Sequence, residues 1–258
     1  MSVITLSLGT MSLQRFPLFL LLIILLAACQ PAALSPTPLP TGTELPLPSA
    51  TASASPSPIP ATPTGTLAPA PLTFTEQFNG TLPYWLFQQV DNGHPAADPI
   101  ANNGFLVFDL TDPNQWVFAL YNMPTYTDVR VDAQTDVPAG GTGAFGVLCR
   151  YSEQQGWYEF NIYTDQSYEL LFGQWLSPGI ARYTPLSSGG SEKIKGDSNE
   201  IGLLCQGSTL TPFINGVQMR SWQDNKFGLK AGMIGISAAS FESVPFTIAY
   251  DWLKVSKP

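Results

Sequence analysis

The chain has 258 residues, a formal net charge of −8, and charged residues at only 12% of its positions. A chain of this length can form one large domain or two small ones. The acidic balance and the lack of a basic stripe argue against a nucleic-acid-binding protein, because phosphate recognition needs clustered Lys and Arg. With 24 prolines and 22 glycines, the composition also argues against a helical protein and favours an all-β domain with frequent turns.

The N-terminus carries an export signal. Phe16 to Ala28 is an unbroken apolar run behind Arg15, and it is too short for a membrane span of about 20 residues. The following segment, Leu26-Ala27-Ala28-Cys29, resembles a bacterial lipobox. The resemblance implies that residues 1–28 are a lipoprotein signal peptide and that Cys29 is lipidated, which would anchor the chain to the membrane outside the cytoplasm. The alternative is an uncleaved membrane anchor in which Cys29 has no role.

Two methionines could begin this signal. The ten residues before Met11 carry no positive charge, whereas a start at Met11 gives the compact basic segment MSLQRF. We expect Met11 to be the initiator rather than Met1. An unprocessed precursor whose mass includes Met1 would contradict this expectation.

Residues 29–71 form a linker. From Gln30 to Pro71 the chain consists mainly of Pro, Ser, Thr, Ala and Leu, and Glu44 is its single charge. Such a composition buries too little apolar surface to fold and favours extended polyproline II. At about 3.1 Å per residue, roughly forty residues would hold the next domain up to about 120 Å from the membrane, at the cell surface. Alternatively, the linker only insulates the domain.

The folded part is expected at residues 72–258. Leu72 to Phe78 is a first strand, and Asn79-Gly80 after it predicts a hairpin turn. A long loop from Asp91 to Asn103 then carries His94, which we interpret as a surface residue. The strands expected around this loop are Trp85–Val90, Gly104–Leu110, Trp116–Tyr121 and Thr127–Val137. In the last of these the apolar residues alternate, which predicts one buried and one wet face.

Gly143 to Trp175 is expected to form three successive antiparallel strands. Ala144 to Tyr151 is apolar at nearly every position, which predicts a central strand covered on both sides. In the next strand Tyr158, Phe160 and Ile162 suit the core, and the other face carries Trp157, Glu159, Asn161 and Tyr163. A tight hairpin at Asp165-Gln166 would set Tyr163 opposite Tyr168.

The remaining strands are short and closely spaced, and no helix of useful length is expected. Asn215-Gly216 is the strongest hairpin signal in the chain. The strands expected after the central three are Ile180–Pro185, Glu200–Gln206, Thr209–Ile214, Gln218–Trp222, Gly232–Ala238 and Phe246–Val255.

Cys149 and Cys205 are the cysteines that remain after the lipobox. A pair in an exported protein predicts a disulfide. Their matching contexts, GVLC and GLLC, suggest neighbouring strands, so the bond would fix the register of one sheet. Two buried free thiols are the alternative.

Six residues form a candidate ligand-binding set on the central strands. Sugar recognition needs an aromatic face together with carboxylate, amide or guanidinium groups, and the strands offer both kinds at Arg150, Trp157, Glu159, Asn161, Tyr163 and Tyr168. The alternative is that the aromatic residues only cover the second face of the sheet, with an ion pair between Glu159 and Arg150.

The run NEIGLLCQGSTLTPFINGVQM, followed by FGLKAGMIGISA and FTIAYDWLKV, resembles a concanavalin A-like lectin/glucanase domain of the laminin-G-like kind. The resemblance implies an antiparallel two-sheet jelly-roll sandwich over about Leu72 to Val255, whose concave sheet often binds glycans. Laminarinase-type glucanases carry Glu-x-Asp-x-x-Glu on one concave strand as nucleophile and acid. Here that strand offers Glu159, Asn161 and Tyr163, without a second carboxylate, so no catalytic residue is assigned.

Calcium is a common structural companion of this fold. Glu76 on the first strand and Asp251 on the last would contribute oxygen ligands, because these strands often pair in the fold. The lone His94 does not make a histidine-based zinc site. We therefore expect a lipid-anchored surface module that binds carbohydrate or acts in adhesion. The alternatives are a glycoside hydrolase of the same fold and a structural or protein-interaction domain without a glycan site.

Overall fold

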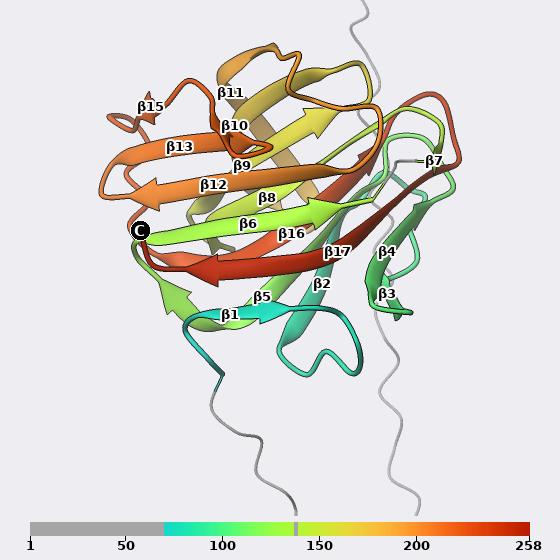
Figure 1. Ribbon diagram of the computed structural model, residues 1–258, viewed down its shortest axis with the longest axis horizontal. Coiled ribbons are helices and arrows are strands. Elements are labelled where there is room, and N and C mark those ends of the chain that lie inside the picture. Colours follow the sequence, from blue (N-terminus) through green and yellow to red (C-terminus); the bar gives the residue numbers. More distant parts are fainter. Residues whose placement is uncertain (1–69, 137–138) are drawn as a thin grey trace, which may run out of the picture. The chain divides into compact units, whose positions relative to one another are not determined.

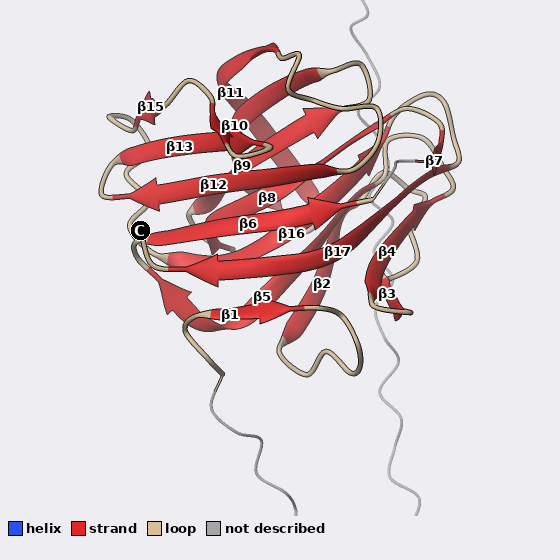
Figure 2. Ribbon diagram, viewed as in Figure 1, coloured by secondary structure: helices blue, strands red, loops and turns tan. Residues whose placement is uncertain are grey.

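The computed structural model describes residues 70–136 and 139–258, and these residues fold into two antiparallel sheets (Figures 1 and 2). One sheet has ten strands. They are β1 (Phe74–Glu76), β3 (Ile100–Asn102), β4 (Phe105–Leu110), β6 (Val129–Thr135), β7 (Ala139–Gly140), β12 (Asn199–Gln206), β13 (Thr209–Ile214), β14 (Val217–Gln218), β15 (Trp222–Gln223) and β17 (Phe246–Ser256).

The second sheet has seven strands in the order β11-β10-β9-β8-β16-β5-β2. They are β2 (Trp85–Val90), β5 (Trp116–Tyr126), β8 (Gly143–Ser152), β9 (Gly156–Tyr163), β10 (Ser167–Ser177), β11 (Ile180–Gly190) and β16 (Gly232–Ser240). No helix occurs in the described ranges, so the prediction of an all-β, two-sheet sandwich is confirmed. The three central strands expected from Gly143 to Trp175 are β8, β9 and β10.

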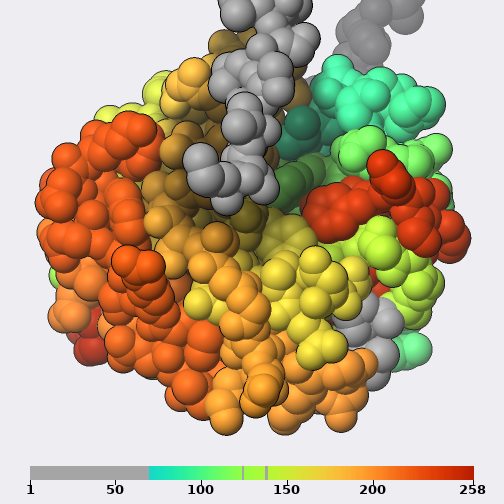
Figure 3. All heavy atoms as spheres, turned by 90° about the horizontal axis from the view of Figure 1, so that it is seen from above, coloured from blue at the N-terminus to red at the C-terminus, as the bar shows by residue number. Residues whose placement is uncertain are grey.

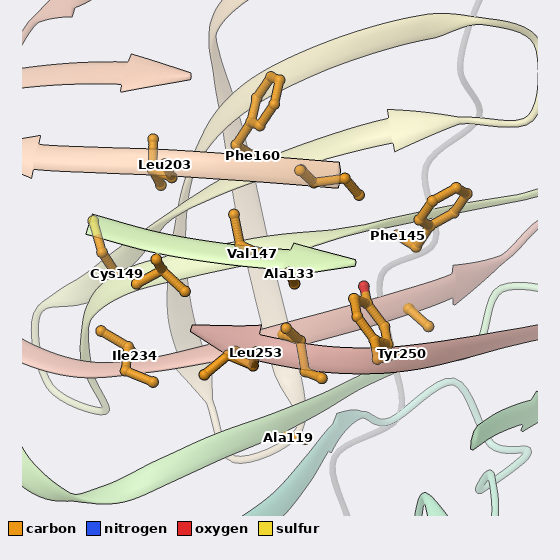
Figure 4. Packing of buried hydrophobic residues seen from close by; sticks show 14 of the residues in the cluster. Ala119, Ala133, Phe145, Val147, Cys149, Phe160, Leu203, Ile234, Tyr250 and Leu253 are labelled. Atoms are coloured by element: carbon orange, nitrogen blue, oxygen red, sulfur yellow. The ribbon is translucent and has the colours of Figure 1, made fainter. Parts of the chain in front are cut away.

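The core lies between the two sheets. Alternation places Val131, Ala133 and Thr135 of β6 on its buried side, as the sequence predicted. Val131 and Ala133 belong to one hydrophobic cluster with Val147 of β8 and Phe160 of β9 from the other sheet. Figure 4 shows apolar side chains of both sheets, among them Ala133, Val147 and Phe160, in the space between the sheets. Burial of this apolar surface holds the sheets face to face.

The disulfide between Cys149 and Cys205 is present, with Cα atoms 6.8 Å apart, and the prediction of a bonded pair is confirmed. The expectation that it joins neighbouring strands of one sheet is wrong, because β8 and β12 belong to different sheets. GVLC and GLLC are similar because both cysteines point from central strands into the core. The bond therefore pins one sheet to the other across the core.

The expected hairpin at Asn79-Gly80 is also wrong. β1 pairs with β17 in the ten-stranded sheet, whereas β2 pairs with β5 in the seven-stranded sheet. Between them Phe78 adopts a left-handed φ of 51° and buries its ring in the core. The chain uses this turn to cross from one sheet to the other. The hairpin at Asn215-Gly216 is confirmed, with both residues at positive φ between β13 and β14.

The hairpin between β9 and β10 differs by one residue from the expected register. Gln166 adopts a φ of 68° and extends the loop to Thr164, Asp165 and Gln166. Tyr168 therefore pairs with Ile162 rather than Tyr163. Because a one-residue shift reverses the face of a strand, Tyr168 points into the core and Tyr163 points to the opposite face.

The predicted signal peptide at residues 1–28, the predicted lipidation of Cys29 and nearly all of the predicted linker at residues 29–71 lie outside the described residues. The choice between Met1 and Met11 lies there too. None of the described residues belongs to a helix long and apolar enough to cross a membrane.

Candidate functional site

The seven-stranded sheet curls until its two edges approach each other. β2 and β11 are the outermost strands, yet the backbone N–H of Asp91, just after β2, donates a 2.7 Å hydrogen bond to the carbonyl of Gly179 at the tip of the β10–β11 hairpin. Tyr183 of β11 stacks on Trp116 of β5 with ring centroids 4.4 Å apart. The face that points away from the core is therefore concave and largely enclosed.

The concave face is filled by the protein's own apolar side chains. Trp157 is completely buried at its centre, with ring centroids 5.3 Å from Trp175, 5.4 Å from Phe118 and 5.7 Å from Tyr183. Together with Leu120, Leu148 and Tyr151 these residues form a second hydrophobic cluster, separate from the core between the sheets. Strands β8 and β9 are consequently buried on both faces.

Glu159 lies inside this enclosure and accepts hydrogen bonds from four side chains. The indole Nε1 of Trp157 donates to Oε2 at 2.9 Å, and the indole Nε1 of Trp116 donates to Oε1 at 3.2 Å. Ser237 and the amide of Asn161 donate to the same Oε1 at 2.5 and 3.0 Å. The carboxyl group thus joins strands β5, β9 and β16 beneath the aromatic layer.

Burial raises the pKa of the Glu159 carboxyl, and the hydrogen bonds from Ser237, Trp157, Asn161 and Trp116 only partly offset this effect. The neighbouring Tyr183 hydroxyl is also buried and lies close to the Glu159 carboxylate. Burial and the nearby Glu159 raise the pKa of this tyrosine. The enclosed Glu159 carboxyl group and Tyr183 hydroxyl therefore stabilise the sheet and do not contact solvent.

A cavity opens at the end of the concave face where the β10–β11 hairpin meets β2, and we call it the mouth cavity. Its volume is about 460 Å³. Its lining combines one large aromatic ring with amide, carboxylate and hairpin residues: Trp175, Gln88, Gln89, Glu153, Gln154, Leu176, Ser177, Pro178 and Gly179. Figure 3 shows the surface of the molecule from above the view of Figure 1, where segments coloured yellow and orange make up much of the visible face.

The ring of Trp175 is fixed in place at this cavity. Its indole Nε1 donates a 2.8 Å hydrogen bond to the hydroxyl of Tyr151. That hydroxyl donates in turn to Oε1 of Gln88 on β2. The half-buried indole therefore presents a preorganised flat surface with polar groups beside it.

The structure brings together three of the six residues expected to bind a ligand. Trp157, Glu159 and Asn161 form one cluster, but all three are enclosed. Tyr163 lies at the far end of the same face, where its hydroxyl donates to Glu169 at 2.8 Å and its ring stacks on Phe241. Burial and Glu169 raise the pKa of Tyr163.

The other two expected residues lie elsewhere. Tyr168 packs against Phe160 on the core side of the sheet. Arg150 is buried and donates to the carbonyls of Thr127 and Leu229 and to the carboxylate of Asp128. The alternative interpretation, an ion pair between Glu159 and Arg150, is therefore wrong. A bulge after Cys149, with Arg150 at a φ of 53°, turns the guanidinium away from Glu159.

Glu76 and Asp251, the expected calcium pair, lie on β1 and β17, which are adjacent as the sequence predicted. The Glu76 carboxylate accepts a hydrogen bond from the backbone N–H of Phe78. Asp251 is exposed and lines a separate hollow. No group of three or more His, Cys, Asp or Glu side chains that could hold a metal occurs within residues 70–136 and 139–258.

Sequence reasoning missed Trp175, Trp116 and Tyr183. Trp175 could have been found from the alternation of side chains along β10. Its residues on the same face as Glu159 are Glu169, Leu171, Gly173 and Trp175. Trp116 and Tyr183 come from strands distant in sequence. Their contact depends on the curl of the sheet, for which the sequence carried no local signal.

Solved structures of the same architecture clarify the fold. A protein of unknown function with a galectin-like fold from Bacillus subtilis superposes with a TM-score of 0.53 at 12% identity, over 71% of this chain and 94% of that one. LamAcat from Zobellia galactanivorans gives 0.51 at 11% identity, over 72% and 97%. The fold is that of the concanavalin A-like lectins and glucanases.

A Bacteroides ovatus mixed linkage glucan GH16 protein, solved in complex with a G4G4G3G product, also superposes, with a TM-score of 0.51 at 11% identity over 71% of this chain and 99% of that one. At such low identity the likeness concerns the fold alone. No protein-family model matches the sequence, and neither does any curated protein.

Proposed function

We propose that this concanavalin A-like domain is a carbohydrate-binding module whose site is the mouth cavity. The observation that carries the proposal is the fixed indole of Trp175, which is surrounded by Gln88, Gln89, Glu153 and Gln154. A sugar ring presents C–H groups on its faces and hydroxyls around its edge. A rigid aromatic surface bordered by amides and a carboxylate complements both.

The size and shape of the cavity support the same proposal. A volume of about 460 Å³ lies within the ordinary range for small-molecule sites. The wall formed by Ser177, Pro178 and Gly179 belongs to the hairpin that is bonded to Asp91, so the cavity is built without a further conformational change. Preorganisation of this kind reduces the entropy that binding must offset.

A binding role fits the site better than glycoside hydrolysis does. Hydrolysis requires two carboxyl groups on either side of the scissile bond. In the mouth cavity Glu153 is the carboxylate of the lining, while Glu159 is enclosed and accepts four hydrogen bonds from neighbouring side chains. A hydrolase of the same fold remains the rival function to be tested against this one.

The proposal includes the place where the module acts. A lipid on Cys29 would attach the chain to the outer side of the bacterial membrane, and the linker at residues 29–71 would extend the domain toward surface polymers. The ligand would then be a glycan of the cell's surroundings, and binding would serve adhesion or capture. Metabolic labelling with a radioactive fatty acid, compared between wild type and Cys29→Ala, tests the anchor.

The binding proposal is tested by affinity electrophoresis of the full-length protein through gels that contain laminarin or mixed-linkage β-glucan. We expect retardation of the wild type by at least one polymer, a loss of about tenfold or more in affinity for Trp175→Ala, and a smaller loss for Trp175→Phe. Met123→Ala, at an exposed residue of β5, is the control. Release of reducing sugar from either polymer would favour the hydrolase instead.

A further inference from the structure

A β-bulge in β17 places two consecutive side chains on the outer face of the ten-stranded sheet, the face that points away from the core. Ile248 and Tyr250 are buried in the core, and after a register shift at residues 250–252 so are Leu253 and Val255. Asp251 and Trp252 consequently both point outward. Bulges commonly re-aim side chains near functional sites.

Trp252 begins a row of side chains that crosses three strands. In register it pairs with Gln134 of β6, and Gln134 pairs with Glu200 of β12. Neighbouring strands lie about 4.8 Å apart, which is close to the length of one pyranose ring. The row therefore presents an indole, an amide and a carboxylate at the spacing of successive sugar units.

Two hollows of about 420 and 600 Å³ meet at Trp252, and we call them together the Trp252 groove. The second hollow continues past Asp132 and Lys254, which pair in register across β6 and β17. Gly202, the partner of Asp132 on β12, has no side chain and so leaves space in the groove. A Cβ atom at Gly202 would collide with the Asp132 carboxylate.

The groove contains polar groups that have no hydrogen-bond partner among the described residues. The Trp252 indole N–H, the Glu200 carboxylate and the Lys254 ammonium make no hydrogen bond to any described residue. The Arg130 guanidinium, in contrast, is bonded to Asp132 at 2.8 Å and lies over the Phe213 ring at 4.1 Å. The side chains of the groove without a hydrogen bond to a described residue therefore include Trp252 and two groups near it.

We propose that the Trp252 groove is a second carbohydrate site that binds a neutral polysaccharide chain laid across β12, β6 and β17. The indole provides the stacking surface, and the amide and carboxylate of the row bind the hydroxyls. The lining holds four carboxylates and two cations. This balance repels a polyanionic chain, so the ligand is neutral. The inference stands independently of the mouth cavity, which lies on the other sheet.

The test uses full-length protein in affinity gels that contain laminarin, mixed-linkage β-glucan, or alginate as an anionic polymer. We expect Trp252→Ala to lower affinity for a neutral glucan about tenfold, Trp252→Phe to retain part of it, and alginate to retard none of the proteins. The combined variant with Trp175→Ala should bind more weakly than either single variant.

The surface variant Glu200→Gln serves as a second probe and should also weaken binding. Unchanged thermal midpoints would show that the variants are folded. Retardation of Trp252→Ala and Glu200→Gln equal to that of wild type, with loss only in Trp175→Ala, would overturn the Trp252 site and leave the mouth cavity intact. A wild-type protein that neither neutral glucan retards would overturn both.

Discussion

The carbonyl of Gly179 accepts a hydrogen bond from the backbone N–H of Asp91 at 2.7 Å, and this bond connects the β10–β11 hairpin to the end of β2. It joins two edges of one sheet that are separated by five intervening strands. Beneath the closure the concave face has become a second hydrophobic cluster. The mouth cavity, beside Trp175, opens where this closing hairpin meets β2.

Gly173→Ala should destabilise the domain through the second cluster. A Cβ atom at residue 173 would collide with the ring of Trp157, which is fully buried and cannot move away. Overpacking of this kind costs about 1–3 kcal/mol of unfolding free energy. Gly196→Ala, where no atom lies within 4 Å of the added carbon, should change it by less than about 0.5 kcal/mol. Urea unfolding of the two variants and wild type checks both values.

Glu159 should make stability fall as pH rises. Because burial raises its folded-state pKa above the ordinary 4.5, the folded protein binds the proton more tightly than the unfolded chain does. The stabilising effect is complete below pH 4.5 and is lost as pH rises through the folded-state pKa. Thermal midpoints measured against pH should lose this downward slope in Glu159→Gln. An identical slope in both proteins would contradict the assignment.

Asp224 should act in the opposite direction. Burial alone would raise its pKa, but hydrogen bonds from the Tyr158 hydroxyl and the backbone N–H groups of Phe227, Lys226 and Gly228 outweigh this and lower it. The stabilisation is present above the ordinary value of 3.8 and is lost as pH falls through the lowered pKa. Asp224→Ala should cost about 2–3 kcal/mol near neutral pH. A loss that is equally large at pH 2 would argue against the carboxylate as its source.

Loss of the disulfide should weaken the connection between the sheets. Cys149 and Cys205 are 56 residues apart in sequence, and the loop-entropy model gives about 4 kcal/mol for a closure of this length. The double variant Cys149→Ala/Cys205→Ala should lose stability of that order in urea unfolding. Wild type treated with reductant should approach the same midpoint, and a midpoint that stays unchanged would refute the role.

Much of the fold could be predicted because local patterns specify it. The alternation of side chains from Val129 to Thr135 predicts a strand, and the dipeptide Asn215-Gly216 predicts a turn. Both patterns lie within a few residues. The positions of β8, β9 and β10 followed from the same kind of signal. The sequence did not show that β8 and β12 belong to different sheets. The similar segments GVLC and GLLC indicate that both cysteines are equally buried, but they do not indicate which sheet each strand joins.

The candidate site was harder to predict, since it depends on curvature and on single left-handed residues. Gln166 shifted the register that would have placed Tyr168 beside Tyr163. The curl that stacks Trp116 on Tyr183 turned the expected open face of Trp157 and Glu159 into an enclosed cluster. Neither effect has a signature in the spacing of polar and apolar residues.

The most direct test of the carbohydrate-binding proposal is an NMR titration of the indole ¹⁵N–H signals of the six tryptophans with laminaritetraose or a mixed-linkage tetrasaccharide. Trp→Phe variants assign the signals. The proposal predicts a saturable shift of the Trp175 signal, while the signal of the enclosed Trp157 stays nearly unchanged. A Trp175 signal that does not move at millimolar concentrations of either sugar, or a shift confined to Trp157, would contradict it.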